Sequence, residues 1–294
     1  MYIARSSRDH CRAMNALFQH AQPTGNSGFE GGASKLPISG VVIAKNEADR
    51  IARCVNSMRQ VCSEVIVLDS GSTDDTVAIA TDAGARVEQQ DWLGFSAQKN
   101  AAIALACNDW ILLLDADEWL TDDSSETLRK LFESGRIEHA DAWLVQRRTR
   151  FLGKKLRFGG WGKEAIVRLF MKRFRYLPAK VHEKLDLSDA RIFNSHVRVE
   201  HDTARSLLEY QRKLKRYAEL FAEQKFSLGK RAGAFTPFSH AFFYAVKNGL
   251  LRGGFLDGPK AWRYHLEHTR YTWLKYQYLR ALKNADSTQV SERP

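Results

Sequence analysis

Short apolar segments that alternate with amphipathic ones are the feature that most constrains the fold of this chain. Strand-like apolar runs occupy residues 38–44, 64–69, 86–89, 110–115, 142–151 and 164–171. Apolar side chains recur at helical spacing in residues 47–58, 73–85 and 95–106, and again after Thr121 to about Ser134. Strands that alternate with helices predict an α/β fold, in which a mostly parallel sheet is covered by helices on both faces.

The segment ILLLDADEWL, residues 111–120, places three carboxylates at the end of an apolar run. Asp115, Asp117 and Glu118 would repel each other there and lose hydration, so a compensating cation is expected. In an open parallel sheet, ligands bind outside the carboxyl ends of the strands. Alternating acids on an extended chain point the same way and suit a hard cation that also holds phosphate oxygens. The motif therefore predicts a Mg²⁺ or Mn²⁺ site.

The segment VLDSGSTDDT, residues 67–76, has the same placement after the second predicted strand. It allows two interpretations. Gly71 permits a tight turn and the Ser, Thr and Asp residues can cap the next helix, which makes a plain strand–turn–helix joint. Alternatively, Asp69 accepts a hydrogen bond from a base N–H in a nucleotide pocket. Asn46 and Glu47 end the first strand and would line the same crevice.

Charge is distributed unevenly along the chain. Residues 1–144 carry 13 Lys and Arg against 21 Asp and Glu, whereas residues 145–294 carry 32 against 13. The basic half suggests an anionic partner. The aromatic and basic residues of 207–221 and 261–282 suit either the headgroup layer of an anionic bilayer or a helical bundle that packs on the catalytic domain. No apolar run is long enough for a signal peptide or a spanning helix, so we expect a cytoplasmic, peripheral membrane protein.

Four motifs in fixed order resemble the nucleotide-sugar domain of family 2 glycosyltransferases: VVIAKNEADRI, VLDSGSTDDT, GFSAQKNAA and LLLDADEWL. FLGKKLRFGGW, VRLF, VHE and GFLDG further resemble the branch that builds the lipopolysaccharide core. The resemblance covers roughly residues 37–280. It implies a GT-A-type catalytic domain at 37–202, a flexible appendage at 1–36 and a helical extension at 203–294 that contacts the membrane or acceptor.

The resemblance also implies an inverting transfer of a hexose, glucose being typical of the branch, from a UDP-sugar to a glycolipid acceptor with Mg²⁺ or Mn²⁺. Asp117 and His182 would bind the metal, and Glu164 would be the general base. Relatives commonly have WYPD where this chain has Gly162, Lys163 and Glu164, so Glu183 and Glu118 stay as alternative bases. The residues that would bind the nucleotide sugar are Ala44, Asn46, Glu47, Asp69, Gly71, Lys99, Asp115 and Ala116. The basic residues of 147–157 could hold acceptor phosphates.

Two other functions are considered. A sugar nucleotidylyltransferase could share the sheet and the paired acids, but it would need a phosphate loop rich in Gly, Arg and Lys where this chain reads AKNEAD. A non-enzymatic nucleic-acid binder could use the basic half. That function leaves the acidic motif at the strand end unexplained, so no nucleic-acid partner is expected.

Overall fold

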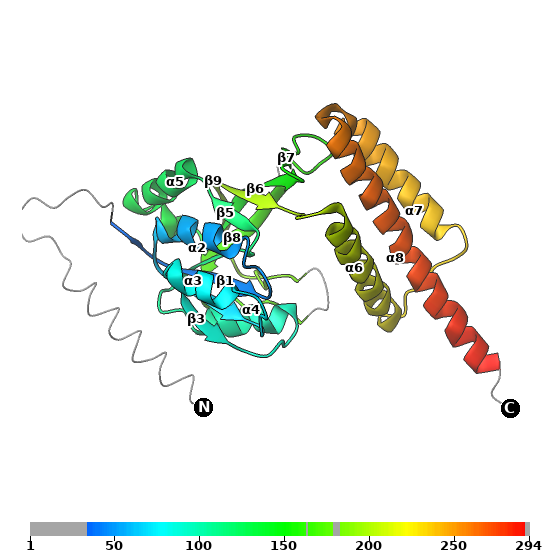
Figure 1. The fold of residues 1–294 in the computed structure, drawn as a ribbon, viewed down its shortest axis with the longest axis horizontal. Coiled ribbons are helices and arrows are strands. Elements are labelled where there is room, and N and C mark those ends of the chain that lie inside the picture. Colours follow the sequence, from blue (N-terminus) through cyan, green and yellow to red (C-terminus); the bar gives the residue numbers. More distant parts are fainter. Residues whose placement is uncertain (1–33, 163, 179–182, 292–294) are drawn as a thin grey trace, which may run out of the picture. The chain divides into compact units, whose positions relative to one another are not determined.

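The computed structural model describes residues 34–162, 164–178 and 183–291 (Figure 1). The chain divides into two compact units. Unit 1 comprises the described residues up to Val145, with Ile166–Leu177 and Lys184–Val199. Unit 2 comprises Gln146–Ala165, the described part of Pro178–Glu183, and the chain from Glu200. The predicted appendage at 1–36 lies almost entirely outside the described residues.

Four parallel strands form the first half of the sheet, in the order β3-β2-β1-β4. Their bounds are β1 (Leu36–Ala44), β2 (Cys62–Asp69), β3 (Arg86–Gln89) and β4 (Trp110–Leu113). The strands predicted at 38–44, 64–69, 86–89 and 110–115 are thereby confirmed in type and place. Asp115 lies just beyond the end of β4 rather than on it, because the strand ends at Leu113.

The sheet continues past β4 in the order β8-β6-β9-β5, and β8 runs antiparallel to β4. These strands are β5 (Glu118–Leu120), β6 (Ala142–Phe151), β8 (Glu164–Met171) and β9 (Ile192–Asp202), and the short β7 (Lys154–Lys155) pairs with β6. The sheet is therefore mixed. β5 and β9 were not predicted, because β5 is very short and β9 alternates exposed and buried residues within a polar sequence.

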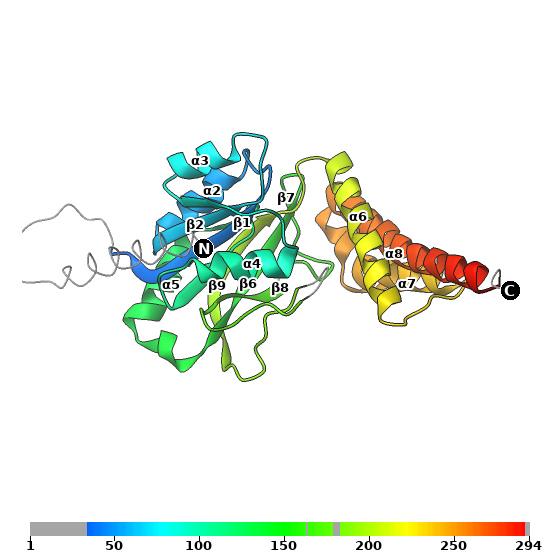
Figure 2. The same ribbon diagram turned by 90° about the horizontal axis from the view of Figure 1, so that it is seen from below.

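Helices cover both faces of the sheet in unit 1. One face carries α2 (Ile51–Arg59), α3 (Thr76–Asp82) and α5 (Asp122–Glu133), and the other carries α4 (Phe95–Ala104). A 3₁₀ turn, η1 (Arg136–His139), follows α5. Figure 2 shows α2 and α3 on the opposite side of β1 and β2 from α4. Val55 and Leu128 belong to the first core and Ile103 to the second, and all three are fully buried. The predicted α/β architecture is confirmed.

Unit 2 is built from three helices: α6 (Leu207–Ser227), α7 (Thr236–Tyr244) and α8 (Pro259–Ser291). A π-helical segment η2 (Ala245–Leu251) and a 3₁₀ turn η3 (Gly254–Asp257) join α7 to α8. In Figure 1, α8 lies between α6 and α7, and it contacts both. No helix among the described residues is long and apolar enough to cross a membrane.

The interior of unit 2 is aromatic. The ring of Phe151 lies 5.1 Å from that of Tyr210 and 5.2 Å from that of Tyr264. Tyr210, Tyr264 and Tyr271 are buried there with Leu214. For these side chains the helical-bundle alternative holds, because they form the core of the bundle. Trp262 of α8 is 57% exposed, and a bilayer contact by the remaining aromatics stays a prediction. The helical spacing of these aromatics could not distinguish contact with a bilayer from contact with another helix, because both would cover the same face of the helix.

Candidate active site

The loops that follow β1, β2 and β4 meet at one edge of the sheet. Ala44, the last residue of β1, is in register with Asp69, the last residue of β2. Leu114, just after β4, donates its backbone N–H to the carbonyl of Val41 at 3.1 Å. Parallel pairing thus brings the predicted donor residues of three loops to the same edge. Ala44 and Ala116 are buried beneath it.

Asp69 organises the turn after β2. Its buried carboxylate accepts the backbone N–H groups of Gly71 and Ser72 through Oδ2, each at 2.9 Å. The turn needs glycine, because Gly71 has a φ of +79°, in the left-handed region. The Asp69 carboxylate therefore has the structural role expected in a strand–turn–helix joint. A hydrogen bond from a nucleobase to Asp69 stays a prediction.

Asn46 joins the β1 loop to the same turn. Its backbone adopts a left-handed φ of 56° and donates its N–H to Ser72 Oγ at 2.8 Å. Its side-chain Oδ1 accepts the N–H of Thr73 at 2.8 Å, and the N–H of Glu47 donates to Thr76 Oγ1 at 2.7 Å. The two loops are thus locked together at the predicted crevice. Asn is one of the few non-glycine residues that accepts this conformation readily.

Arg168, on β8, neutralises two of the three carboxylates of the DADE motif. Its Nη2 donates to Asp115 Oδ2 at 2.6 Å and to Glu118 Oε1 at 2.7 Å. Glu118 is fully buried and also accepts the backbone N–H of Asp115 at 3.2 Å. Burial alone would lower the pKa of Arg168, but the Asp115 and Glu118 carboxylates outweigh it and hold the pKa well above its usual value. Glu118 is thus a buried structural carboxylate, which removes it as a base that must reach an acceptor hydroxyl.

Lys99 and Arg50 complete the charge balance. Lys99 Nζ lies 3.6 Å from Asp115 Oδ1, and Arg50 Nη1 lies 3.5 Å from Asp117 Oδ2. Three carboxylates therefore face three cationic side chains. Protein cations therefore supply part of the compensation that the sequence argument had assigned to a metal ion, and the metal ion itself stays a prediction. Sequence reasoning identified Lys99 but missed Arg50, which precedes α2, and Arg168, which lies on β8.

The field of the three carboxylates extends to Cys54 on α2. Burial raises the pKa of the Cys54 thiol well above its usual value, and Glu118, Asp117 and Asp115 raise it further. Cys54 therefore stays a neutral thiol at physiological pH and fills space in the first core. It is unsuited to be a nucleophile.

The acids fit a metal ion that is shared with a substrate. Among the described residues, no group of three or more His, Cys, Asp or Glu side chains could hold a metal ion by itself. Asp117 and Asp115 offer hard oxygen donors, and Mg²⁺ is commonly held by one or two carboxylates plus substrate phosphates. The predicted ligand His182 lies outside the described residues.

The predicted bases belong to unit 2. Glu164 opens β8, and Arg147 on β6 donates to its Oε2 from Nε at 3.2 Å and from Nη2 at 2.6 Å. Both bonds use one carboxylate oxygen. Glu183 is half-buried and follows the undescribed residues 179–182. Glu164 and Glu183 thus belong to unit 2, whereas Asp69 and Asp117 belong to unit 1.

The glycine-rich loop before Glu164 is packed rather than open. Asp257 Oδ2 accepts the backbone N–H groups of Arg157 and Phe158 at 2.7 and 2.9 Å. A Cβ on Gly159 would lie 2.2 Å from the His265 ring, so only glycine fits this contact. These contacts hold the described residues of the loop against the helices of unit 2. Sequence reasoning recorded GFLDG only as a motif, whereas its Asp257 fixes the loop.

The basic residues of the loop region are partly paired. Glu200 is buried, and Arg148, Arg150 and Lys155 lie 4.0, 2.7 and 3.5 Å from its carboxylate. Three cations surround one carboxylate, so the cluster keeps a positive charge. An anionic acceptor group can therefore still be attracted there.

Comparisons with known proteins point in one direction. The family model described as Glycosyl transferase family 2 matches residues 39–185. The lipopolysaccharide core biosynthesis glycosyltransferase LpsC of Rhizobium meliloti is 30% identical over 232 residues, which cover 75% of this chain and 84% of LpsC. An uncharacterized glycosyltransferase of Rickettsia conorii is 38% identical over 162 residues, 54% of this chain and 56% of that protein.

Other matches are partial. An uncharacterized glycosyltransferase of Rickettsia felis is 47% identical over 109 residues, 38% of its length, so the chain matches about half or less of these two rickettsial relatives. The solved glucosyl-3-phosphoglycerate synthase from Mycobacterium tuberculosis is 28% identical with a TM-score of 0.32, over 38% of this chain and 44% of that one. The family match and the length of the alignment with LpsC establish that this chain belongs to glycosyl transferase family 2.

Proposed function

We propose that this protein is an inverting hexosyltransferase that moves a sugar, glucose in the first instance, from a nucleoside-diphosphate donor to a lipopolysaccharide-core or similar glycolipid acceptor. One observation carries the proposal: the loops after β1, β2 and β4 bring Asp69, Asp115 and Asp117 to one sheet edge. The lipopolysaccharide-core acceptor is suggested by the printed name of LpsC. We propose the cytoplasmic face of the inner membrane as its location.

The donor would lie along the edge formed by these loops. The Asp69 turn and Asn46 present backbone and side-chain groups to a uridine, and Lys99 stands beside Asp115 to meet the phosphates. Asp117 and Asp115 would hold Mg²⁺ or Mn²⁺. A divalent cation bound there supplies positive charge to the departing diphosphate. Arg50 and Arg168 would hold the Asp117 and Asp115 carboxylates in place before the donor arrives.

An inverting displacement also needs a base on the acceptor hydroxyl. Glu164 is the first candidate, since both Arg147 bonds use Oε2 and a proton could be taken by Oε1. Arg147 would orient this carboxylate through its two hydrogen bonds. Glu183 is the second candidate because it belongs to the VHE motif that the branch shares.

The test is a transfer assay with a panel of radiolabelled nucleotide sugars and truncated core oligosaccharide acceptors, in the presence of Mg²⁺ or Mn²⁺. The proposal expects one UDP-sugar to label one acceptor and the anomeric configuration to invert. Asp82→Asn, an exposed acid on α3, is the matched control for Asp117→Asn. Equal transfer by Asp117→Asn and Asp82→Asn would remove the acidic motif from the reaction. Transfer only to a non-lipid acceptor would overturn the acceptor class while leaving the transferase activity.

A further inference from the structure

A row of exposed apolar side chains follows α7 and the segment after it. We call Phe235, Phe238, Phe242, Phe243, Leu250 and Leu251 the α7 face. Phe235 is 84% exposed and Phe242 is 72% exposed, although phenylalanine is among the residues most often buried. Pro237 and Ala241, on the opposite side of α7, are buried. The helix therefore has an inner face that meets the bundle and an outer apolar face that is largely exposed, where Lys247 Nζ lies 5.4 Å from the centre of the Phe243 ring.

The charges around the α7 face are of one sign. Residues 235–270, all of them described, contain five cationic side chains: Lys247, Arg252, Lys260, Arg263 and Arg270. The stretch has two carboxylates, and both are buried. Asp257 accepts the backbone of the glycine-rich loop, and Glu267 pairs with Arg263 at 3.0 Å. The surface of this stretch thus presents cations and apolar side chains without an exposed acid.

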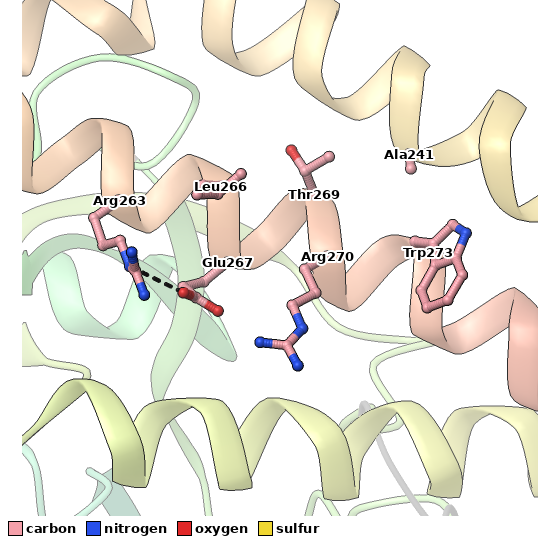
Figure 3. A pocket seen from close by; sticks show the side chains of 7 residues that line it. All are labelled: Ala241, Arg263, Leu266, Glu267, Thr269, Arg270 and Trp273. Atoms are coloured by element: carbon pink, nitrogen blue, oxygen red, sulfur yellow. Dashed lines mark ion pairs between the residues drawn. The ribbon is translucent and has the colours of Figure 1, made fainter.

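A pocket of about 490 Å³ lies between α7 and the outer side of α8. Ala241 contributes from α7, while Leu266, Arg270 and Trp273 contribute from α8 (Figure 3). In Figure 3 the Arg270 side chain extends away from α7. An apolar floor with a cation at its border suits a phosphate headgroup and the start of its acyl chains.

We propose that the α7 face, with the pocket beside it, docks this protein onto an anionic phospholipid bilayer, with the phenylalanines among the headgroups and upper acyl chains. The charge pattern favours this occupant, because cations border the apolar side chains and the carboxylate that lines the pocket, Glu267, is already paired with Arg263. The phenylalanines project from the outside of a single helix rather than lining a groove. A fluid bilayer can surround projecting side chains, whereas a folded partner would have to offer a matching cavity.

This inference goes beyond the proposed transfer reaction and does not depend on it. It places the membrane contact on phenylalanines of α7, whereas the sequence pattern had pointed to the aromatic and basic residues of 207–221 and 261–282, of which Tyr210, Tyr264 and Tyr271 are buried. It also predicts binding that combines apolar insertion with electrostatic attraction. High salt should therefore weaken vesicle binding without abolishing it.

The experiment is co-sedimentation of the full chain with phosphatidylcholine vesicles, with and without phosphatidylglycerol. Phe238→Ser/Phe242→Ser removes two exposed rings from the α7 face. Ile192→Ser/Phe193→Ser, two exposed apolar residues on β9 of unit 1, is the matched control. Arg270→Gln tests the charge, with the exposed Arg136→Gln of unit 1 as its control. Circular dichroism and the unfolding midpoint check that each variant is folded.

We expect wild type and both controls to bind phosphatidylglycerol vesicles and to bind phosphatidylcholine more weakly. Each phenylalanine ring that would be buried in the bilayer should contribute about tenfold or more to the partition coefficient. The Phe238→Ser/Phe242→Ser variant should therefore bind vesicles about a hundredfold more weakly than wild type. Wild-type binding by the folded double variant would overturn the proposal, as would no binding of wild type to any vesicle. Self-association of wild type that the double variant abolishes, seen by analytical ultracentrifugation without lipid, would assign the α7 face to a second copy instead.

Discussion

Replacing Arg168 by methionine should destabilise the protein strongly. Arg168 is fully surrounded and its Nη2 bridges the Asp115 and Glu118 carboxylates at 2.6 and 2.7 Å. Methionine fills similar space but leaves Glu118, which is 0% exposed, without its cation. Removing one partner of a buried ion pair costs about 3–5 kcal/mol. For a protein of this size that loss lowers the thermal midpoint by about 6–20 °C.

The assay is urea unfolding of wild type, Arg168→Met and the double variant Arg168→Met/Glu118→Gln, followed by circular dichroism. The double variant should recover much of the loss, because a neutral amide no longer needs a cation. Arg173→Met is the control, because Arg173 also belongs to unit 1 but is half exposed and pairs with Asp141. A midpoint for Arg168→Met equal to that of Arg173→Met would refute the idea that Arg168 carries the charge balance of the DADE motif.

Three further predictions follow from particular groups. Burial lowers the pKa of His268 to about 3, so below pH 6.5 the unfolded chain binds a proton that the folded chain does not. The free energy of unfolding of unit 2 should therefore fall by about 1.4 kcal/mol per pH unit as the pH drops from 6.5 towards 3. Urea unfolding of His268→Gln should show a flatter pH dependence than that of wild type. Asp69→Asn places an amide against the backbone N–H groups of the turn, which should lower the free energy of unfolding by about 1–3 kcal/mol. The same change should weaken UDP binding in a calorimetric titration. An unchanged UDP affinity would place the nucleotide elsewhere. Glu164→Gln should slow transfer about 10²–10⁴-fold while UDP affinity stays near wild type; a loss seen only in Glu183→Gln would move the base to Glu183.

Periodicity predicted unit 1 well because three of its parallel strands, β1, β2 and β4, are apolar and largely buried on both sides. The runs ending at Ala44 and Asp69 have no competing interpretation as helices, since turn residues bound them closely. β9 escaped prediction because one of its sides is exposed and its sequence is polar. The basic–aromatic helices predicted for residues 207–221 and 261–282 exist within α6 and α8, but a pattern along one helix does not say whether lipid or another helix covers its aromatic side.

The site was predictable where its residues are close in sequence and unpredictable where they converge from distant elements. The carboxylates of Asp115 and Asp117 follow directly from the apolar run before them. Their counter-charges do not, because Arg50 precedes α2 and Arg168 sits in the middle of β8, far away along the chain. A long-range ion pair leaves no local periodic signal. The sequence argument therefore assigned the whole compensation to a metal ion, when part of it comes from the protein.

The most direct test of the proposed chemistry is a calorimetric titration of UDP into wild type and Asp117→Asn, each with Mn²⁺ and again with EDTA. If Asp117 holds the cation at the diphosphate, Mn²⁺ should raise UDP affinity of wild type by about tenfold or more, as expected for charge-assisted phosphate contacts. The Asp117→Asn variant should bind UDP with nearly the same affinity in both conditions. Metal-independent UDP binding by wild type, or an undiminished Mn²⁺ effect in Asp117→Asn, would contradict the assignment of the donor site to this edge of the sheet.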